Sequence, residues 1–128
     1  MDRRPTSPSA RSAGALQERL IAFAVGACGR ARQVRRDPAT IAVIEQLARA
    51  ATSPAANYAE ACAARSRRDF LHKMHICLGE LRETRALLIL LDRLDPHETP
   101  GPIAECDELI AIFVTSIRTA TRGLRKGT

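Results

Sequence analysis

The stretch that decides the fold is residues 66–94, which read SRRDFLHKMHICLGELRETRALLILLDRL. One set of mostly apolar side chains recurs at alternating intervals of four and three residues, which places them along one face of an α-helix. The set consists of Phe70, Met74, Cys77, Leu81, Thr84, Leu88 and Leu91. Ser66 precedes it as a candidate N-cap, and Asp69 stands three residues later, where a carboxylate reaches back to the helix start. The stretch therefore predicts one long amphipathic helix.

The second half of this helix, residues 86–91 (ALLILL), is apolar on every side. A helix at the protein surface needs only one apolar stripe, so this segment requires a second explanation. Either several helices of the same chain surround it, or it faces another subunit. We favour the subunit, which makes Leu87, Ile89 and Leu90 candidate oligomer-contact residues.

Three further segments show the same helical spacing, over about residues 13–34, 38–62 and 103–124. Asp37-Pro38 starts the second of them, because an aspartate N-cap followed by proline at the first helical position is a common helix start. Residues 95–102 hold three prolines and a glycine and predict a loop. Four such helices with short connections predict an all-α, up-down four-helix bundle over residues 13–126. Because Pro54 interrupts the second helix, we expect a kink near residues 50–54.

Composition limits the classes of protein that remain. The 128 residues fit one domain, and 45% apolar but only 3% aromatic residues suit closely packed helices. The net charge is +6, and all 20 basic residues except Lys73 and Lys126 are arginine, which binds phosphate in a bidentate way. An acidic partner is one interpretation, and an arginine-rich surface without such a role is the other. The four cysteines stand singly, which indicates reduced thiols rather than a zinc module or a disulfide framework.

The N-terminal region raises the question of targeting. Residues 1–12 (MDRRPTSPSARS) predict a disordered basic arm. Residues 25–28 (VGAC) resemble a lipoprotein cleavage box, but the preceding apolar run is short and Glu18-Arg19 lies directly against it, which disfavours a signal sequence. No stretch reaches the roughly 18 apolar residues of a membrane span, so we expect a cytoplasmic protein.

Residues 46–61 (QLARAATSPAANYAEA) resemble the motif Q-L-R-R-A-A-x-S-I-P-A-N-I-A-E-G of the protein family encoded in bacterial 23S rRNA intervening sequences. Residues 66–70 (SRRDF) and 78–83 (LGELRE) resemble later segments of the same family. Departures of this chain from the family pattern include Pro54, which stands one place early, and Ala61, which replaces a glycine. In the second half, Thr84-Arg85 stand where a more uniformly apolar or acidic face is expected. The specific resemblance covers residues 46–94, and it extends to the first and last helices only as a pattern.

The resemblance implies a four-helix bundle that assembles into rings, commonly pentamers. It also brings in the accessory proteins of diversity-generating retroelements, which are basic, form rings and bind RNA or DNA beside a reverse transcriptase. We therefore expect a homo-oligomeric, pentameric bundle that binds the backbone of RNA or DNA. The alternative is a homo-oligomeric scaffold that binds protein and has no nucleic-acid role.

Basic residues gather in three stretches of the sequence, which an up-down bundle places at its two ends. Each of the two resulting clusters is a candidate nucleic-acid contact. In an up-down bundle the turn between the second and third helices lies beside the end of the fourth helix, so their basic residues form one rim. This rim consists of Arg65, Arg67, Arg68, Arg122, Arg125 and Lys126, with Lys73 nearby. The second cluster, at the opposite end, consists of Arg30, Arg35 and Arg36.

The motif residues receive a structural rather than a catalytic interpretation. They are Arg49, Ser53, Pro54, Asn57 and Glu60. We expect Asn57 or Ser53 to satisfy the carbonyl that Pro54 frees near residue 50, and Glu60 to pair with Arg49 or Arg82. No nucleophile–base pair is evident, which argues against an enzyme. His72 and His75 lie one turn apart, but without further ligands they predict no metal site, and no cofactor is expected.

Overall fold

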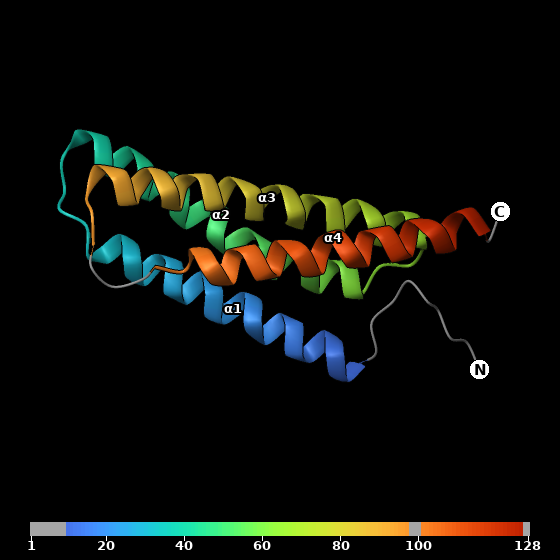
Figure 1. Ribbon diagram of the computed structural model, residues 1–128. Coiled ribbons are helices and arrows are strands. Elements are labelled where there is room, and N and C mark those ends of the chain that lie inside the picture. The colour runs from blue at the N-terminus through green and yellow to red at the C-terminus, as the bar shows by residue number, and fades with distance from the viewer. Residues whose placement is uncertain (1–9, 98–100, 127–128) are drawn as a thin grey trace.

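The computed structural model describes residues 10–97 and 101–126, which form four helices (Figure 1). They are α1 (Ala10–Arg32), α2 (Pro38–Cys62), α3 (Arg67–Leu94) and α4 (Ile103–Lys126). The described ranges contain no β-strand, and the predicted all-α four-helix fold is confirmed. The first helix begins three residues before the predicted start at residue 13. Residues 1–9 of the predicted arm lie outside the described residues, as does the side chain of Lys126.

Two helix starts follow from local hydrogen bonds that the sequence already indicates. The Asp37 carboxylate accepts from the backbone N–H groups of Ala39 and Thr40 at 2.9 and 3.0 Å, and the Thr40 hydroxyl accepts from the Asp37 N–H at 2.9 Å. This reciprocal capping box fixes the start of α2. At the start of α3 the Ser66 hydroxyl accepts from the Asp69 N–H at 3.1 Å, which confirms Ser66 as the N-cap.

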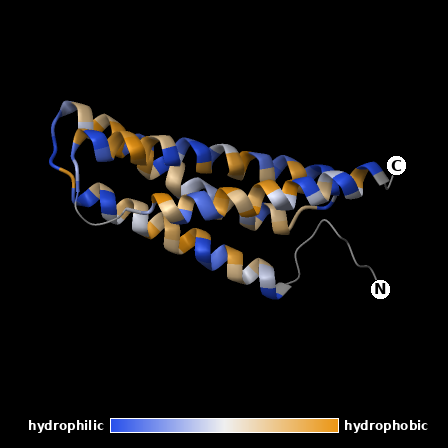
Figure 2. Cartoon of the chain, in the orientation of Figure 1, coloured by the Kyte–Doolittle hydropathy of each residue, from blue (hydrophilic) through white to orange (hydrophobic). Residues whose placement is uncertain are grey.

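Successive helices run in opposite directions, and α2 packs most extensively against α3 (Figure 1). The seams between α3 and α4 and between α1 and α2 are also extensive, whereas α1 and α4 touch over a short length only. Consequently α1 and α3 occupy diagonal positions in the bundle. Each helix alternates hydrophobic and hydrophilic residues along its length (Figure 2), and none is long and apolar enough to cross a membrane in the part of the chain that is described.

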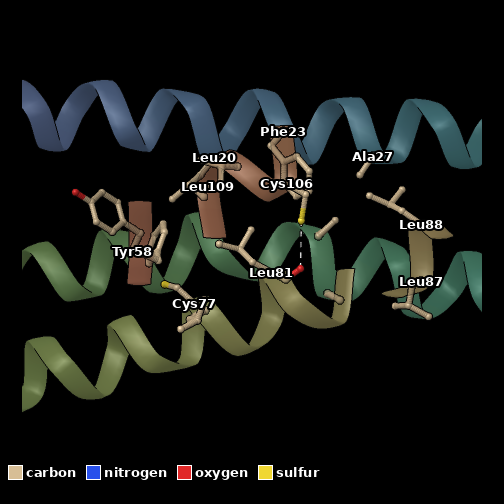
Figure 3. Close-up of a cluster of buried hydrophobic side chains, with 14 of the residues drawn as sticks. Leu20, Phe23, Ala27, Tyr58, Cys77, Leu81, Leu87, Leu88, Cys106 and Leu109 are labelled. Atoms are coloured by element: carbon tan, nitrogen blue, oxygen red, sulfur yellow. Dashed lines mark hydrogen bonds between the residues drawn. The ribbon is translucent and has the colours of Figure 1, made fainter. Parts of the chain in front are cut away.

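The core is built from leucine, alanine and a few larger side chains contributed by all four helices (Figure 3). Tyr58 and Phe113 meet edge to face, with ring centroids 5.7 Å apart. The buried Cys106 thiol donates a hydrogen bond to the Leu81 carbonyl at 3.3 Å, and the Cys77 thiol donates to the Pro54 carbonyl at 3.6 Å. Two of the four cysteines therefore act as small core side chains with a weak donor.

Pro54 lies inside α2, which continues through it as a helix. The Asn57 side chain donates to the carbonyl and to the hydroxyl of Ser53, at 3.1 and 2.8 Å. Asn57 and Ser53 thus bond to each other one turn apart rather than to the carbonyl at residue 50. The bend expected at Pro54 stays a prediction.

The apolar segment 86–91 receives a different explanation from the one that the sequence favours. Leu87, Leu88 and Leu91 are all buried within this chain, because α3 has α2 on one side and α4 on the other. Leu87 is therefore unavailable to a second subunit, and its assignment to an oligomer contact is wrong. Ile89 is half-buried, and Ala86 and Leu90 are exposed, Leu90 at 44%.

Candidate nucleic-acid interface

A groove of about 370 Å³ runs along the seam between α3 and α4, towards the end where α4 finishes. We call it the basic groove. Its lining consists of Leu78 and Arg82 from α3, with Val114, Ile117, Arg118, Thr121, Arg122 and Arg125 from α4. The α4 residues recur at intervals of three and four, which places them on one side of the helix. The apolar members Leu78 and Ile117 are buried, so the groove has an apolar floor and an arginine rim.

None of the described residues that line the basic groove is acidic. Arg82, Arg118 and Arg122 are exposed, and they form no hydrogen bond or ion pair with any residue that the structure describes. The nearby Asp107 is already paired, with Arg85 at 2.5 Å. The charges of Arg82, Arg118 and Arg122 are therefore not neutralised by an ion pair within the described residues. Arginine forks suit the planar, bidentate recognition of phosphate.

Arg67 confirms that the two chain segments of the predicted rim are adjacent. Its guanidinium donates to the Gly123 carbonyl in the last turns of α4 at 2.5 Å, which ties the start of α3 to the end of α4. Arg67 is half-buried in this bond, whereas Arg65 and Arg68 are exposed at the same end. The structure thus keeps Arg65 and Arg68 accessible and gives Arg67 a capping role.

A comparison with models of known protein families identifies the family of this chain. The family model described as 23S rRNA-intervening sequence protein matches residues 21–112. The chain belongs to this family. No curated protein and no solved structure matches the chain significantly.

The match to the 23S rRNA-intervening sequence family ends at residue 112, before every arginine that α4 contributes to the basic groove. The support for the basic groove is therefore the geometry of this chain, and not the family match. Sequence reasoning found Arg122 and Arg125 but missed Arg82 and Arg118. The spacing Arg118–Arg122–Arg125 was a visible sign of one helical face, but the contribution of Arg82 depends on the register of α3 against α4.

Lys73 lies on the side of α3 that faces away from the basic groove. Its ammonium group pairs with the Glu60 carboxylate of α2 at 2.5 Å. Glu60 thus pairs with neither Arg49 nor Arg82. Because Lys73 faces α2 and its charge is partly neutralised, it does not join the basic groove.

Arg30 is a correction to the second predicted cluster. Its side chain is only 3% exposed, and it donates to Asp92 Oδ1 from Nε at 3.0 Å and to the Asp95 carbonyl at 2.8 Å. Arg30 therefore links the ends of α1 and α3 and cannot reach a nucleic acid. Arg35 and Arg36 remain exposed, at the end of the bundle away from the basic groove (Figure 1).

A second groove of about 410 Å³ lies between α1 and α4, and we call it the neutral groove. Tyr58 and Met74 line it together with hydroxyl and apolar side chains of α1 and α4. Its one charged residue, Arg19, is bidentate to Glu105 at 2.7 and 3.0 Å and also reaches Glu108. These carboxylates raise the pKa of Arg19, so its guanidinium stays protonated. Sequence reasoning missed this groove because it depends on the short contact between α1 and α4.

The buried thiols are not set up as nucleophiles. Burial raises the pKa of Cys77 to about 12 and that of Cys106 to about 12, so both stay protonated at neutral pH. Within residues 10–97 and 101–126 no three side chains of the metal-binding types come together. His72 and His75 are exposed on α3. The chemistry that the described surface offers best is the binding of an anion by arginine.

Proposed function

We propose that this 23S rRNA-intervening sequence protein is a non-catalytic, cytoplasmic protein that binds the phosphate backbone of RNA or DNA. The observation that carries the proposal is the rim of Arg82, Arg118 and Arg122, three cations without an ion-pair partner among the described residues, along a groove whose described lining holds no acidic residue. Arg65 and Arg68 extend the positive surface at the same end. Lysine and arginine contacts to phosphate supply most of the affinity of backbone-directed nucleic-acid binding.

The proposed binding is weakly specific for sequence. All four aromatic residues of the chain, Phe23, Tyr58, Phe70 and Phe113, are buried in the core. Proteins that read single-stranded bases commonly stack them on exposed aromatic rings, and this chain offers none. Arginine contacts to the backbone position a nucleic acid but carry no direct sequence information.

The test is a fluorescence-anisotropy titration of a labelled RNA at a series of salt concentrations. Each neutralised phosphate of a single strand contributes about 0.7 to the slope of log affinity against log salt. Three groove arginines therefore predict a slope of about −2. Binding that is absent at low salt, or that is indifferent to salt, would contradict the proposal.

We further propose that the chain forms a homo-oligomeric ring, a pentamer. Support comes from exposed apolar side chains on two diagonal helices: Ile21 (41%) and Val25 (67%) on α1, and Leu90 (44%) and Leu94 (38%) on α3. Two different patches on different sides of a subunit suit head-to-tail contacts, which close into rings, rather than a two-fold symmetric dimer.

Replacing Val25 with glutamate is expected to dissociate the assembly and to leave the subunit folded. Val25 is two-thirds exposed within the chain, so a charge there costs the isolated bundle little, but it would be buried in a subunit contact. Sedimentation velocity measures the assembly, and circular-dichroism melting measures the fold. Ala111→Glu, at an exposed position of α4, is the matched control. A wild-type monomer, or a Val25→Glu oligomer of unchanged size, would rule out this contact.

The finer proposal is that the ring serves beside the reverse transcriptase of a diversity-generating retroelement, and its support is the sequence resemblance alone. The alternative, a protein-binding scaffold, is favoured by the neutral groove, whose only charge is already paired. The two functions differ in the surface that they use. A scaffold would tolerate loss of Arg118 and Arg122, whereas a nucleic-acid-binding protein would not.

A further inference from the structure

We infer that the basic groove takes an unstacked nucleotide of a single strand, with the base on the apolar floor and the flanking phosphates on the arginine rim. This inference rests on the proposed nucleic-acid binding and names the form of nucleic acid that the groove accepts. It predicts that single strands bind better than duplexes. An arginine rim on a flat surface would give no such preference.

The groove presents two kinds of surface within a short distance. Its floor is made by Leu78, Ile117 and the half-buried Val114, and these side chains offer only apolar contact. Its rim is made by guanidinium groups. A nucleotide has the same division, because the flat faces of its base are apolar and its phosphate is anionic. Guanidinium planes also stack on bases, which gives the rim a second way to hold a base without an aromatic ring.

A duplex and a single strand differ in the groups that they can bring to the floor of the groove. A volume of about 370 Å³ lies in the range of sites that hold small ligands. A duplex keeps its bases paired and stacked inside, and it presents phosphates and sugars on its outside. A duplex therefore contacts the arginine rim alone, whereas a single strand turns a base inwards and gains contact with the floor as well.

Thr121 adds a polar group of fixed character. Its hydroxyl donates to the Ile117 carbonyl at 2.7 Å within α4. Because the proton is used in that bond, the Thr121 oxygen can only accept a hydrogen bond from a molecule in the groove. A base N–H group or a ribose hydroxyl can supply the donor, whereas the phosphodiester group of the backbone has no proton to donate.

The experiment compares two labelled oligonucleotides by fluorescence anisotropy: a single-stranded ten-residue poly-U RNA and a blunt-ended ten-base-pair RNA duplex without a loop. Four forms of the full-length protein are used: wild type, Val114→Ser, Arg118→Ala and Arg49→Ala. Val114→Ser removes apolar floor and leaves every charge in place. Arg49→Ala is the control for Arg118→Ala, because it removes the same charge from an exposed position on α2, diagonal to α4. Circular-dichroism melting checks that each variant is folded.

The wild type is expected to bind the single strand about fivefold or more tightly than the duplex, since burial of one base against the apolar floor is expected to contribute about that factor. Val114→Ser is expected to lower affinity for the single strand alone. Arg118→Ala is expected to weaken binding of both oligonucleotides more than Arg49→Ala does.

Two results would overturn the inference and leave the proposed function standing. One is equal wild-type affinity for the two oligonucleotides, and the other is a folded Val114→Ser variant with unchanged affinity for the single strand. A different result would overturn the proposed function itself: no binding of either oligonucleotide, or equal losses for Arg118→Ala and Arg49→Ala.

Discussion

Replacing Asp92 with alanine is expected to destabilise the bundle by about 3 kcal/mol, because it leaves the buried Arg30 cation without a carboxylate. Asp92 Oδ1 accepts a hydrogen bond from Arg30 Nε at 3.0 Å and lies 2.9 Å from Nη2 in the ion pair, and the arginine side chain is 3% exposed. Breaking a buried ion pair typically costs about 3–5 kcal/mol. The lower end applies here because Asp92 is itself 36% exposed.

Removing the cation instead is expected to cost less. In Arg30→Met a flexible apolar side chain fills much of the arginine's volume, and water reaches the remaining Asp92 carboxylate. The Asp95 carbonyl loses one donor, which costs about 1 kcal/mol. Arg30 Nη1 is buried without a partner among the described residues, so its removal also relieves a desolvated group.

Urea denaturation of the two single variants measures both free energies of unfolding. The diagnostic result is which variant loses more free energy of unfolding. A larger loss for Asp92→Ala shows that the buried Arg30 charge needs a carboxylate partner, and not only that the arginine stem packs in the core. A larger loss for Arg30→Met than for Asp92→Ala would show that packing by the arginine stem dominates at this end of the bundle.

The helices and their starts were predictable because they depend on local sequence. The stripe from Phe70 to Leu91 follows the helical period, and Asp37 and Ser66 cap helices through side chains that act within three residues. Such features need no knowledge of how one helix lies on another. They fix the all-α fold before any packing is considered.

The fate of the basic run at residues 30–36 depends on packing. Arg30 lies three residues after Ala27 and four before Val34, both of them core residues, so the helical period already placed it beside the core. The usual exposure of arginine outweighed this sign. Its carboxylate partner lies 62 residues later in the sequence, and no local pattern connects the two.

The basic groove and the contacts of the apolar end of α3 could not be predicted from the sequence for the same reason. Whether Leu87 or Leu90 meets a neighbour depends on which sides of α3 are flanked by α2 and α4. Likewise Arg82 joins Arg118 only through the register of α3 against α4. Both facts belong to the packing of whole helices, which periodicity within one helix does not determine.

Reversing the charge of two groove arginines, in a variant that combines Arg118→Glu with Arg122→Glu, is expected to weaken RNA binding on the order of a hundredfold at low salt. Two phosphate contacts are lost, and two carboxylates then repel the backbone. Both positions are exposed and unpaired within the described residues, so the fold should survive. The matched control combines Arg11→Glu with Arg49→Glu, which makes the same change in net charge at exposed positions of α1 and α2.

The most direct test of the central claim is an anisotropy titration of one labelled RNA with the wild type, the groove variant and this control. We expect that the groove variant loses about a hundredfold in affinity and that its salt slope becomes shallower by about 1.4, while the control loses far less. Equal losses for the groove variant and the control would contradict it, because binding would then follow net charge rather than the groove between α3 and α4.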